Sequence, residues 1–124
     1  MKKPLILVVE DDPVVRELTK RQLAVLGFDA VAVPSGEEAV EQDCDGVGLI
    51  FMDIGLPGID GIQATLLIRE KELKENRKRV PIVALTAHAD SKKCALAGMD
   101  DFLQKPALIE DIRRTIRKWL GVCA

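Results

Sequence analysis

Cysteine and histidine are scarce in this chain. Its 124 residues include three cysteines, Cys44, Cys94 and Cys123, and a single histidine, His88. The number of cysteines is odd, and no pair has the spacing of a metal site or a redox motif. We therefore expect isolated thiols in a reducing compartment. A lone histidine is usually incidental, so a tuning role for His88 stays an alternative.

Long apolar runs and an excess of one charge are also missing. No run approaches the ~20 apolar residues that a membrane helix requires, and Leu5–Val9 is too short for the core of a signal peptide. We therefore expect a cytoplasmic chain without a membrane segment. The net charge of −2 gives no attraction to nucleic acid. A length of 124 residues, 48% of them hydrophobic, fits one globular domain over residues 1–124.

Five short apolar runs predict β-strands. The first, third and fourth are continuously apolar, as is typical of parallel strands covered on both faces, whereas the second and fifth are weaker and are expected at the edges. The five runs are Leu5–Val9, Ala30–Val33, Leu49–Met52, Ile82–Leu85 and Phe102–Gln104.

A helix is predicted after each strand. The capping signals are Asp12-Pro13, Ser35 with Glu38, Asp60-Gly61, and Asp90 or Ser91, and the fifth helix carries Leu108 to Leu120. Gly27, Gly98 and Gly121 are expected to end the first, fourth and fifth helices. The apolar positions expected in the first and third helices are Val14, Val15, Leu18, Val25, Leu26, Ile62, Leu66 and Leu67. This alternation predicts an α/β, flavodoxin-like (βα)5 fold, a doubly wound five-stranded parallel sheet with strand order 2-1-3-4-5.

Polar side chains that can carry chemistry follow four of the predicted strands. Glu10 and Asp11 follow the first, Asp53 the third, Thr86 the fourth and Lys105 the fifth. The carboxyl ends of parallel strands meet at one edge of the sheet, where ligands bind in this class of fold. At ~4 Å and an effective dielectric near 20, each pair of carboxylates repels by about 4 kcal/mol. The carboxylates must therefore be neutralised or protonated, and a divalent cation together with Lys105 is the interpretation we favour.

The ligand atoms are all oxygens, which favours a hard ion, and Mg²⁺ commonly combines one or two carboxylates with phosphate oxygens. A carboxylate can itself accept a phosphoryl group. Asp53 is the candidate acceptor because it ends the most central strand. The Thr86 hydroxyl can donate a hydrogen bond to a phosphoryl oxygen, and Lys105 can neutralise its charge.

Several segments together resemble the signature of response-regulator receiver domains of two-component signalling. They are Leu7–Pro13, Met52–Gly61, Ala84–Ala87 and Lys105-Pro106. The segments from Leu85 to Ala89 and from Gly98 to Phe102 are particularly similar to those of receivers attached to hybrid histidine kinases. The resemblance covers essentially the whole chain.

The resemblance implies a mechanism. Asp53 would be phosphorylated by a phosphohistidine on a histidine kinase or a histidine phosphotransfer protein, which would switch a partner-binding surface. Mg²⁺ would be held by Asp11, Asp53 and the backbone carbonyl of Gly55, with Glu10 acting directly or through water. Lys105, in a cis peptide with Pro106, would bind the phosphoryl group. Thr86 and Phe102 would form the switch pair. Such a domain is not an enzyme beyond its own phosphorylation and slow dephosphorylation, and it can be part of a larger hybrid kinase or response regulator.

Three other functions are possible on this fold. A haloacid-dehalogenase-type hydrolase needs a second Asp two positions after its nucleophile, where this chain has Gly55. A flavin or nucleotide binder on the same fold would place the ligand's phosphate after the first strand, where three acids would repel it unless a metal intervened. A scaffold that binds partners without phosphorylation stays open. The stretch from Thr86 to Gly98 is a few residues shorter than in most relatives, which leaves open how the switch reaches the usual output face.

Three further features have ordinary structural readings. The basic segment Lys71–Arg79 is expected on a solvated helix end. Trp119 is expected to pack on its helix or to anchor a partner. Phe102 is expected to be a core ring.

Overall fold

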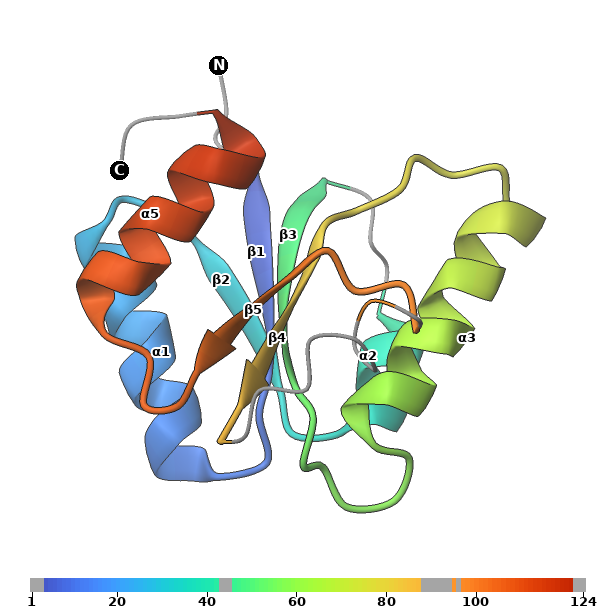
Figure 1. The fold of residues 1–124 in the computed structure, drawn as a ribbon, viewed down its shortest axis with the longest axis horizontal. Coiled ribbons are helices and arrows are strands. Elements are labelled where there is room, and N and C mark those ends of the chain that lie inside the picture. The colour runs from blue at the N-terminus through green and yellow to red at the C-terminus, as the bar shows by residue number, and fades with distance from the viewer. Residues whose placement is uncertain (1–3, 43–45, 88–94, 96, 122–124) are drawn as a thin grey trace.

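The computed structural model of the chain describes residues 4–42, 46–87, 95 and 97–121 (Figure 1). The expectations for the three cysteines, for His88 and for a helix capped at Asp90 or Ser91 lie outside the described residues.

Five parallel strands form one sheet in the order β2-β1-β3-β4-β5, which confirms the predicted fold and strand order. The strands are β1 Leu5–Val9, β2 Ala30–Val33, β3 Val47–Asp53, β4 Ile82–Thr86 and β5 Asp101–Gln104. β3 and β5 begin earlier than predicted, at Val47 and Asp101. β3 and β4 each end one residue later than predicted because backbone pairing continues through their polar last residues, with Asp53 opposite Leu85 and Thr86 opposite Gln104. Asp53 and Thr86 therefore belong to the rigid sheet.

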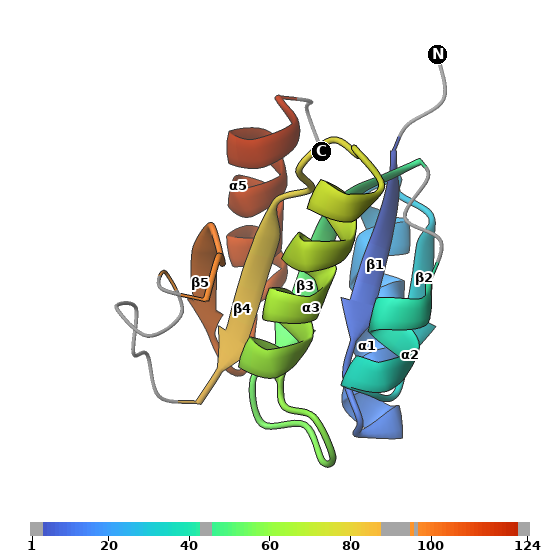
Figure 2. The same cartoon turned by 90° about the vertical axis from the view of Figure 1, so that its right-hand side faces the viewer.

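Helices cover both faces of the sheet. α1 Pro13–Val25 and α5 Ile109–Leu120 lie on one face, and α2 Gly36–Glu41 and α3 Gly61–Lys74 lie on the other (Figures 1 and 2). Three helices begin at the side chains that the sequence indicated, since Asp12, Ser35 and Asp60 each accept a backbone N–H of the first turn. All the helices in the described part of the chain are too short or too polar to cross a bilayer.

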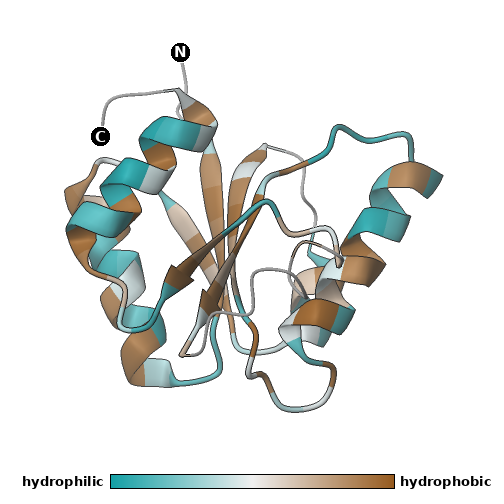
Figure 3. Ribbon diagram, viewed as in Figure 1, coloured by the Kyte–Doolittle hydropathy of each residue, from teal (hydrophilic) through white to brown (hydrophobic). Residues whose placement is uncertain are grey.

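Two apolar cores lie on the two faces of the sheet (Figure 3). One joins Leu7, Ile50 and Met52 to Ala64 and Ile68 of α3. The other joins strand residues such as Phe51 to Leu23 of α1 and to Ile112 and Ile116 of α5. Because both faces of β1, β3 and β4 are covered, these strands read as continuous apolar runs in the sequence.

Several of the apolar side chains expected in α1 and α3 are exposed to solvent. Val14 and Val25 are each 75% exposed, and Leu18, Leu66 and Leu67 are exposed as well. The buried positions of the two helices are instead Thr19, Leu23, Gly61, Ala64, Thr65, Ile68 and Glu72. Leu23 and Ile68 share the buried side of these helices with small residues and a paired acid, so apolar size alone does not identify that side.

Candidate functional site

The predicted polar side chains meet at the carboxyl ends of β1, β3, β4 and β5. They line a cleft of about 480 Å³, to which Glu10, Asp11, Asp53, Gly55, Thr86 and Lys105 all contribute. A larger cleft of about 730 Å³ involves Pro4, Gly48 and Arg79. The smaller cleft is the candidate site because it holds the acids.

Three carboxylates in the cleft lie close enough to share one ion. Glu10, Asp11 and Asp53 each offer an oxygen, and these oxygens lie within 4.8 Å of one another. Glu10 is 1% exposed and Asp53 is 5% exposed, whereas Asp11 is exposed to solvent. The predicted convergence of acids from β1 and β3 is therefore confirmed. An all-oxygen set of this charge fits a hard divalent ion such as Mg²⁺.

Hydrogen bonds from the start of α1 hold the loop that follows β1. The backbone N–H of Asp12 donates to Glu10 Oε2 at 3.2 Å, and the Asp12 side chain caps α1. Arg16 Nη1 donates to the backbone carbonyls of Glu10 at 2.9 Å and Asp11 at 3.3 Å. The sequence analysis did not identify Arg16. The one feature that could have indicated it is a positive charge about one helical turn after the acids.

Lys105 joins the two buried acids. Its Nζ lies 2.7 Å from Glu10 Oε1 and 3.0 Å from Asp53 Oδ2. The peptide bond from Lys105 to Pro106 is cis, as the resemblance implied. The Lys105 backbone N–H donates to the Thr86 carbonyl at 2.8 Å. The end of β4 therefore helps to position the lysine that follows β5.

Asp53 is held by backbone as well as by charge. The Gly55 N–H donates to Asp53 Oδ1 at 3.0 Å, which leaves Oδ2 for Lys105. The start of α3 lies against the end of β3. The Gly61 N–H donates to the carbonyl of Ile54, the residue after Asp53, at 3.1 Å. A Cβ on Gly61 would overlap the Asp53 carbonyl oxygen. Only glycine fits there without a shift of the backbone.

Burial changes the acid–base behaviour of Glu10. Desolvation raises the pKa of the Glu10 carboxyl from 4.5 to about 7, against the hydrogen bond from Lys105 and with a smaller contribution from Asp53. Burial alone would lower the pKa of the Lys105 ammonium. Its hydrogen bonds to Glu10 and Asp53 outweigh burial, so the pKa of Lys105 lies above its ordinary value of 10.5. A proton and a cation therefore compete for Glu10 near neutral pH.

Thr86 and Phe102 lie on the same face of the sheet. Thr86 pairs with Gln104 and Phe102 pairs with Ala84, so the two side chains are diagonal neighbours on adjacent strands. Thr86 is buried, but Phe102 is 37% exposed, so the expectation of a core ring is wrong. β5 is an edge strand whose residues alternate between partly buried and exposed, and Phe102 occupies an exposed position.

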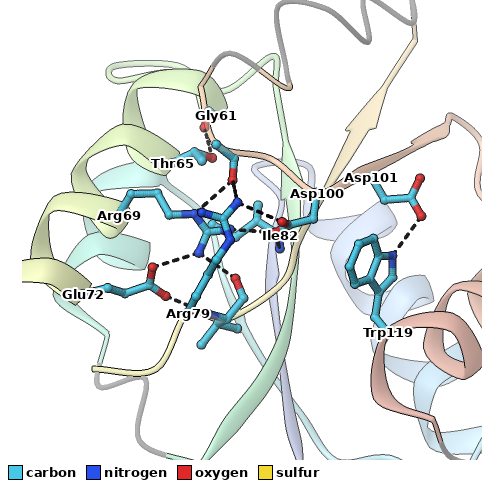
Figure 4. Close-up of polar contacts among 11 residues, drawn as sticks. Gly61, Thr65, Arg69, Glu72, Arg79, Ile82, Asp100, Asp101 and Trp119 are labelled. Carbon is cyan, nitrogen blue, oxygen red and sulfur yellow. Dashed lines mark hydrogen bonds and ion pairs between the residues drawn. The ribbon is translucent and has the colours of Figure 1, made fainter. Parts of the chain in front are cut away.

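The basic segment at the end of α3 also differs from expectation. Residues 73–79 are exposed as predicted, but Glu72 is buried and pairs with Arg69, whose side chain is 12% exposed and also pairs with Asp100 (Figure 4). The sequence does contain an indication of this network, because Glu72 falls on the same helical face as Ala64, Thr65 and Ile68. An acid at such a position requires a partner.

Trp119 packs against the core of the α1–α5 face and donates from Nε1 to Asp101 Oδ2 at 2.9 Å. The structural reading of this residue is confirmed.

Comparisons with known proteins agree with this geometry. Residues 6–117 match the family described as response regulator receiver domain. The chain is 38% identical over 123 residues to the sensor protein GacS of Pseudomonas syringae pv. syringae. That alignment covers 96% of this chain and 14% of the relative, so the chain spans about one seventh of the relative's length.

Two solved structures are similar along nearly their full lengths. One is a co-crystal structure of the Saccharomyces cerevisiae histidine phosphotransfer protein Ypd1 with the receiver domain of its response regulator Ssk1. It matches with a TM-score of 0.88 and 32% identity, over 94% of this chain and 88% of that chain. The other is the receiver domain of a sensor histidine kinase from Pseudomonas aeruginosa PAO1 with magnesium in its active-site cleft. It matches with a TM-score of 0.84 and 37% identity, over 98% of this chain and 100% of that chain.

Proposed function

The chain belongs to the response regulator receiver family, and from this membership we propose that it accepts a phosphoryl group on Asp53 in a two-component phosphorelay. One observation carries the proposal. Glu10, Asp11 and Asp53 place carboxylate oxygens within 4.8 Å of one another, and the Lys105 ammonium lies 2.7 Å from Glu10 and 3.0 Å from Asp53. Acids at this spacing suit a divalent ion beside a reactive carboxylate.

The residues proposed to hold Mg²⁺ are Asp11, Asp53 and the carbonyl of Gly55, with Glu10 acting directly or through water. When bound, the ion supplies positive charge against the carboxylates and the incoming phosphoryl oxygens. Asp11 suits this role because it is exposed at the mouth of the cleft. Glu10, which is buried, must lose its proton to take part.

In the transfer step, a carboxylate oxygen of Asp53 attacks the phosphorus of a phosphohistidine. The new O–P bond forms as the N–P bond breaks, and the imidazole leaves with the electron pair. The Gly55 N–H orients the carboxylate through Oδ1. Lys105 exchanges its ion pair with Asp53 for one with the phosphoryl oxygens, and the Thr86 hydroxyl donates to one of them.

This chemistry ends at one turnover. We infer that the domain catalyses only its own phosphorylation and slow dephosphorylation, because Gly55 stands where a turnover hydrolase would need a general acid. The added charge of about −1.5 to −2 draws Thr86 toward the phosphoryl group. Phe102, exposed in this state, then turns inward, which changes the surface presented to a partner.

The surface beside the cleft suits a protein donor. Val14 and Leu18 of α1 and Leu108 before α5 are all more than half exposed. Leu18 also lines an apolar groove of about 250 Å³ that continues to Lys105 and Pro106. We propose that the phosphohistidine-bearing protein docks here, as a histidine phosphotransfer protein of the kind in the yeast complex or as a histidine kinase. An exposed apolar surface of this sort commonly marks a protein interface.

The test is labelling by acetyl phosphate with Mg²⁺. The wild-type chain should gain one acid-stable, hydroxylamine-labile phosphoryl group, and Asp53→Asn should gain none. Asp12→Asn is the matched control because Asp12 lines the same cleft but caps α1, and asparagine preserves a cap. Unchanged labelling of Asp53→Asn would show that Asp53 is not the acceptor.

A further inference from the structure

The strand that carries the switch residue and leads to Lys105 has few side-chain anchors. β5 has four residues at the edge of the sheet, where Leu103 packs against a core cluster and Asp101 accepts a hydrogen bond from Trp119, which ties the strand to α5 rather than to β4. A slip of one residue would turn Phe102 to the opposite face and displace Lys105. The register of β5 against β4 therefore needs another support.

Asp100 supplies contacts at the start of this strand (Figure 4). Its backbone N–H donates to the Ile82 carbonyl at 2.8 Å, and its carboxylate Oδ2 accepts the Ile82 N–H at 2.9 Å. One residue thus satisfies both backbone groups of the first residue of β4. This two-point attachment fixes which residue of β5 lies opposite each residue of β4.

Arg69 of α3 holds the Asp100 carboxylate in place. Its Nη2 lies 2.7 Å from Asp100 Oδ2, its Nη1 donates to the Val80 carbonyl at 2.7 Å, and its Nε donates to the Gly98 carbonyl at 3.0 Å. Glu72 completes the network, accepting from Arg69 Nη1 at 2.9 Å and from the Val80 N–H at 2.8 Å. One guanidinium therefore ties α3 to the segments that lead into β4 and into β5.

The approach of Arg69 to Gly98 depends on the conformation of that glycine. Gly98 has a φ of +98°, and a Cβ there would lie 3.1 Å from Arg69 Cγ. The backbone turn before β5 is thus shaped around the arginine side chain.

We propose that Arg69, acting through Asp100, is a positioning residue that sets the β4–β5 register and so places Lys105 in the site and Phe102 beside Thr86. The consequence for phosphorylation rests on the proposed function, whereas the register itself does not. Along β5, a shift at Asp100 passes to Lys105 through an extended strand whose pairing ends with the Lys105 N–H on the Thr86 carbonyl.

The network contains its own control residue. Arg79 also pairs with Asp100 Oδ1, at 2.9 Å, and donates to the Gly98 carbonyl at 3.1 Å, but its side chain is 58% exposed, and the Ile82 N–H donates to the other carboxylate oxygen, Oδ2. The Arg69 side chain is 12% exposed. Exposed ion pairs contribute little, whereas removing one partner of a buried pair leaves the other uncompensated. Loss of Arg69 should therefore matter, and loss of Arg79 should not.

The first experiment measures backbone amide hydrogen exchange by NMR in the unphosphorylated protein without Mg²⁺. Arg69→Met and Asp100→Asn should each speed exchange of the Lys105 amide at least tenfold relative to that of Ile6, which pairs with Asp29 at the far side of the sheet. Arg79→Met should leave that ratio unchanged. An unchanged ratio in both test variants, or an equal loss in Arg79→Met, would overturn the proposal. If Arg69→Met does not fold, Asp100→Asn decides the outcome.

The second experiment asks whether register reaches the chemistry. At saturating Mg²⁺, labelling by acetyl phosphate should slow at least fivefold in Asp100→Asn. The affinity for Mg²⁺ should not fall, because the acids follow β1 and end β3, and displacement of Lys105 removes a positive charge that competes for them. A parallel loss of Mg²⁺ affinity and rate would indicate general destabilisation and contradict the positioning role. Absence of labelling in the wild type would overturn the proposed function, and the exchange measurement would still decide the register.

Discussion

Lys105 joins two buried acids, and the balance among these three charges decides how the site responds to pH. Glu10 is the least exposed of the acids, and its burial outweighs the attraction of the ammonium 2.7 Å away. The arrangement is therefore unfavourable for folding at neutral pH without a cation. Charge crowding of this kind is common where a site is built to bind a ligand rather than to stabilise the fold.

A pH dependence of stability follows from Glu10. Its pKa is about 7 in the folded chain and near 4.5 when exposed, so below pH 4.5 the group is protonated in both states. As the pH rises from 4.5 to 7, the unfolded chain releases the proton first, and folded stability falls. Glu10→Gln cannot release a proton. In urea unfolding with chelator, the variant should match wild type near pH 4.5 and exceed it by on the order of 1–3 kcal/mol at pH 8. A difference that does not change with pH would contradict this account.

The start of α3 is the element whose contact with the site is tightest. Gly61→Ala places a methyl group against the Asp53 carbonyl and Ile54, so β3 or α3 must shift. We expect a loss of about 1–3 kcal/mol in unfolding free energy, together with slower labelling of Asp53. Gly46→Ala is the control, because Gly46 has a positive φ but a Cβ there meets nothing within 4 Å. That variant should lose stability and keep the labelling rate. Equal labelling rates in the two variants would mean that the fit at Gly61 does not affect the site.

The exposed side of α1 gives a prediction about donors. Leu18→Glu should slow phosphotransfer from a phosphorylated histidine phosphotransfer protein by about tenfold or more, because a buried interface residue becomes charged. Labelling by acetyl phosphate, which needs no docking surface, should be unchanged. Leu73→Glu is the matched control, since Leu73 is a fully helical, 84% exposed leucine on α3. If both leucine variants transfer at the wild-type rate, α1 is not the donor surface.

Element types and strand order follow from the sequence because the strand runs are continuous and the caps are explicit. Which side of a helix faces the sheet is harder to derive. In α1 and α3 the sheet-facing positions include small residues, Ala64 among them, and large apolar side chains such as Leu18 point to solvent. Burial at these positions depends on how closely helix and sheet approach, which local periodicity does not encode.

The site was easier to derive than the network that supports it. Asp53 ends β3, and Glu10 and Lys105 directly follow β1 and β5, so parallel topology brings them together. Arg69 lies in α3 and Asp100 lies just before β5, 31 residues away, so their pairing depends on tertiary placement, which local periodicity does not encode. The exposed ring of Phe102 likewise depends on the edge position of β5.

At the scale of the whole molecule, the site and the ends of the fold are separated. The acids lie at the carboxyl edge of the sheet, whereas β1 begins and α5 ends at the opposite edge (Figure 1). In relatives such as the sensor protein of Pseudomonas syringae, the matching segment is a small part of a longer chain. This separation leaves the cleft clear of the start of β1 and the end of α5.

The central claim is that the phosphoryl group resides on Asp53. The most direct measurement is borohydride reduction of the chain after reaction with acetyl phosphate and Mg²⁺, followed by peptide mass spectrometry. Reduction converts a phosphorylated aspartate to homoserine, and we predict homoserine at position 53. Homoserine at position 11 or 12 instead, or an unmodified peptide around Asp53 in protein that carries a phosphoryl group, would contradict the account.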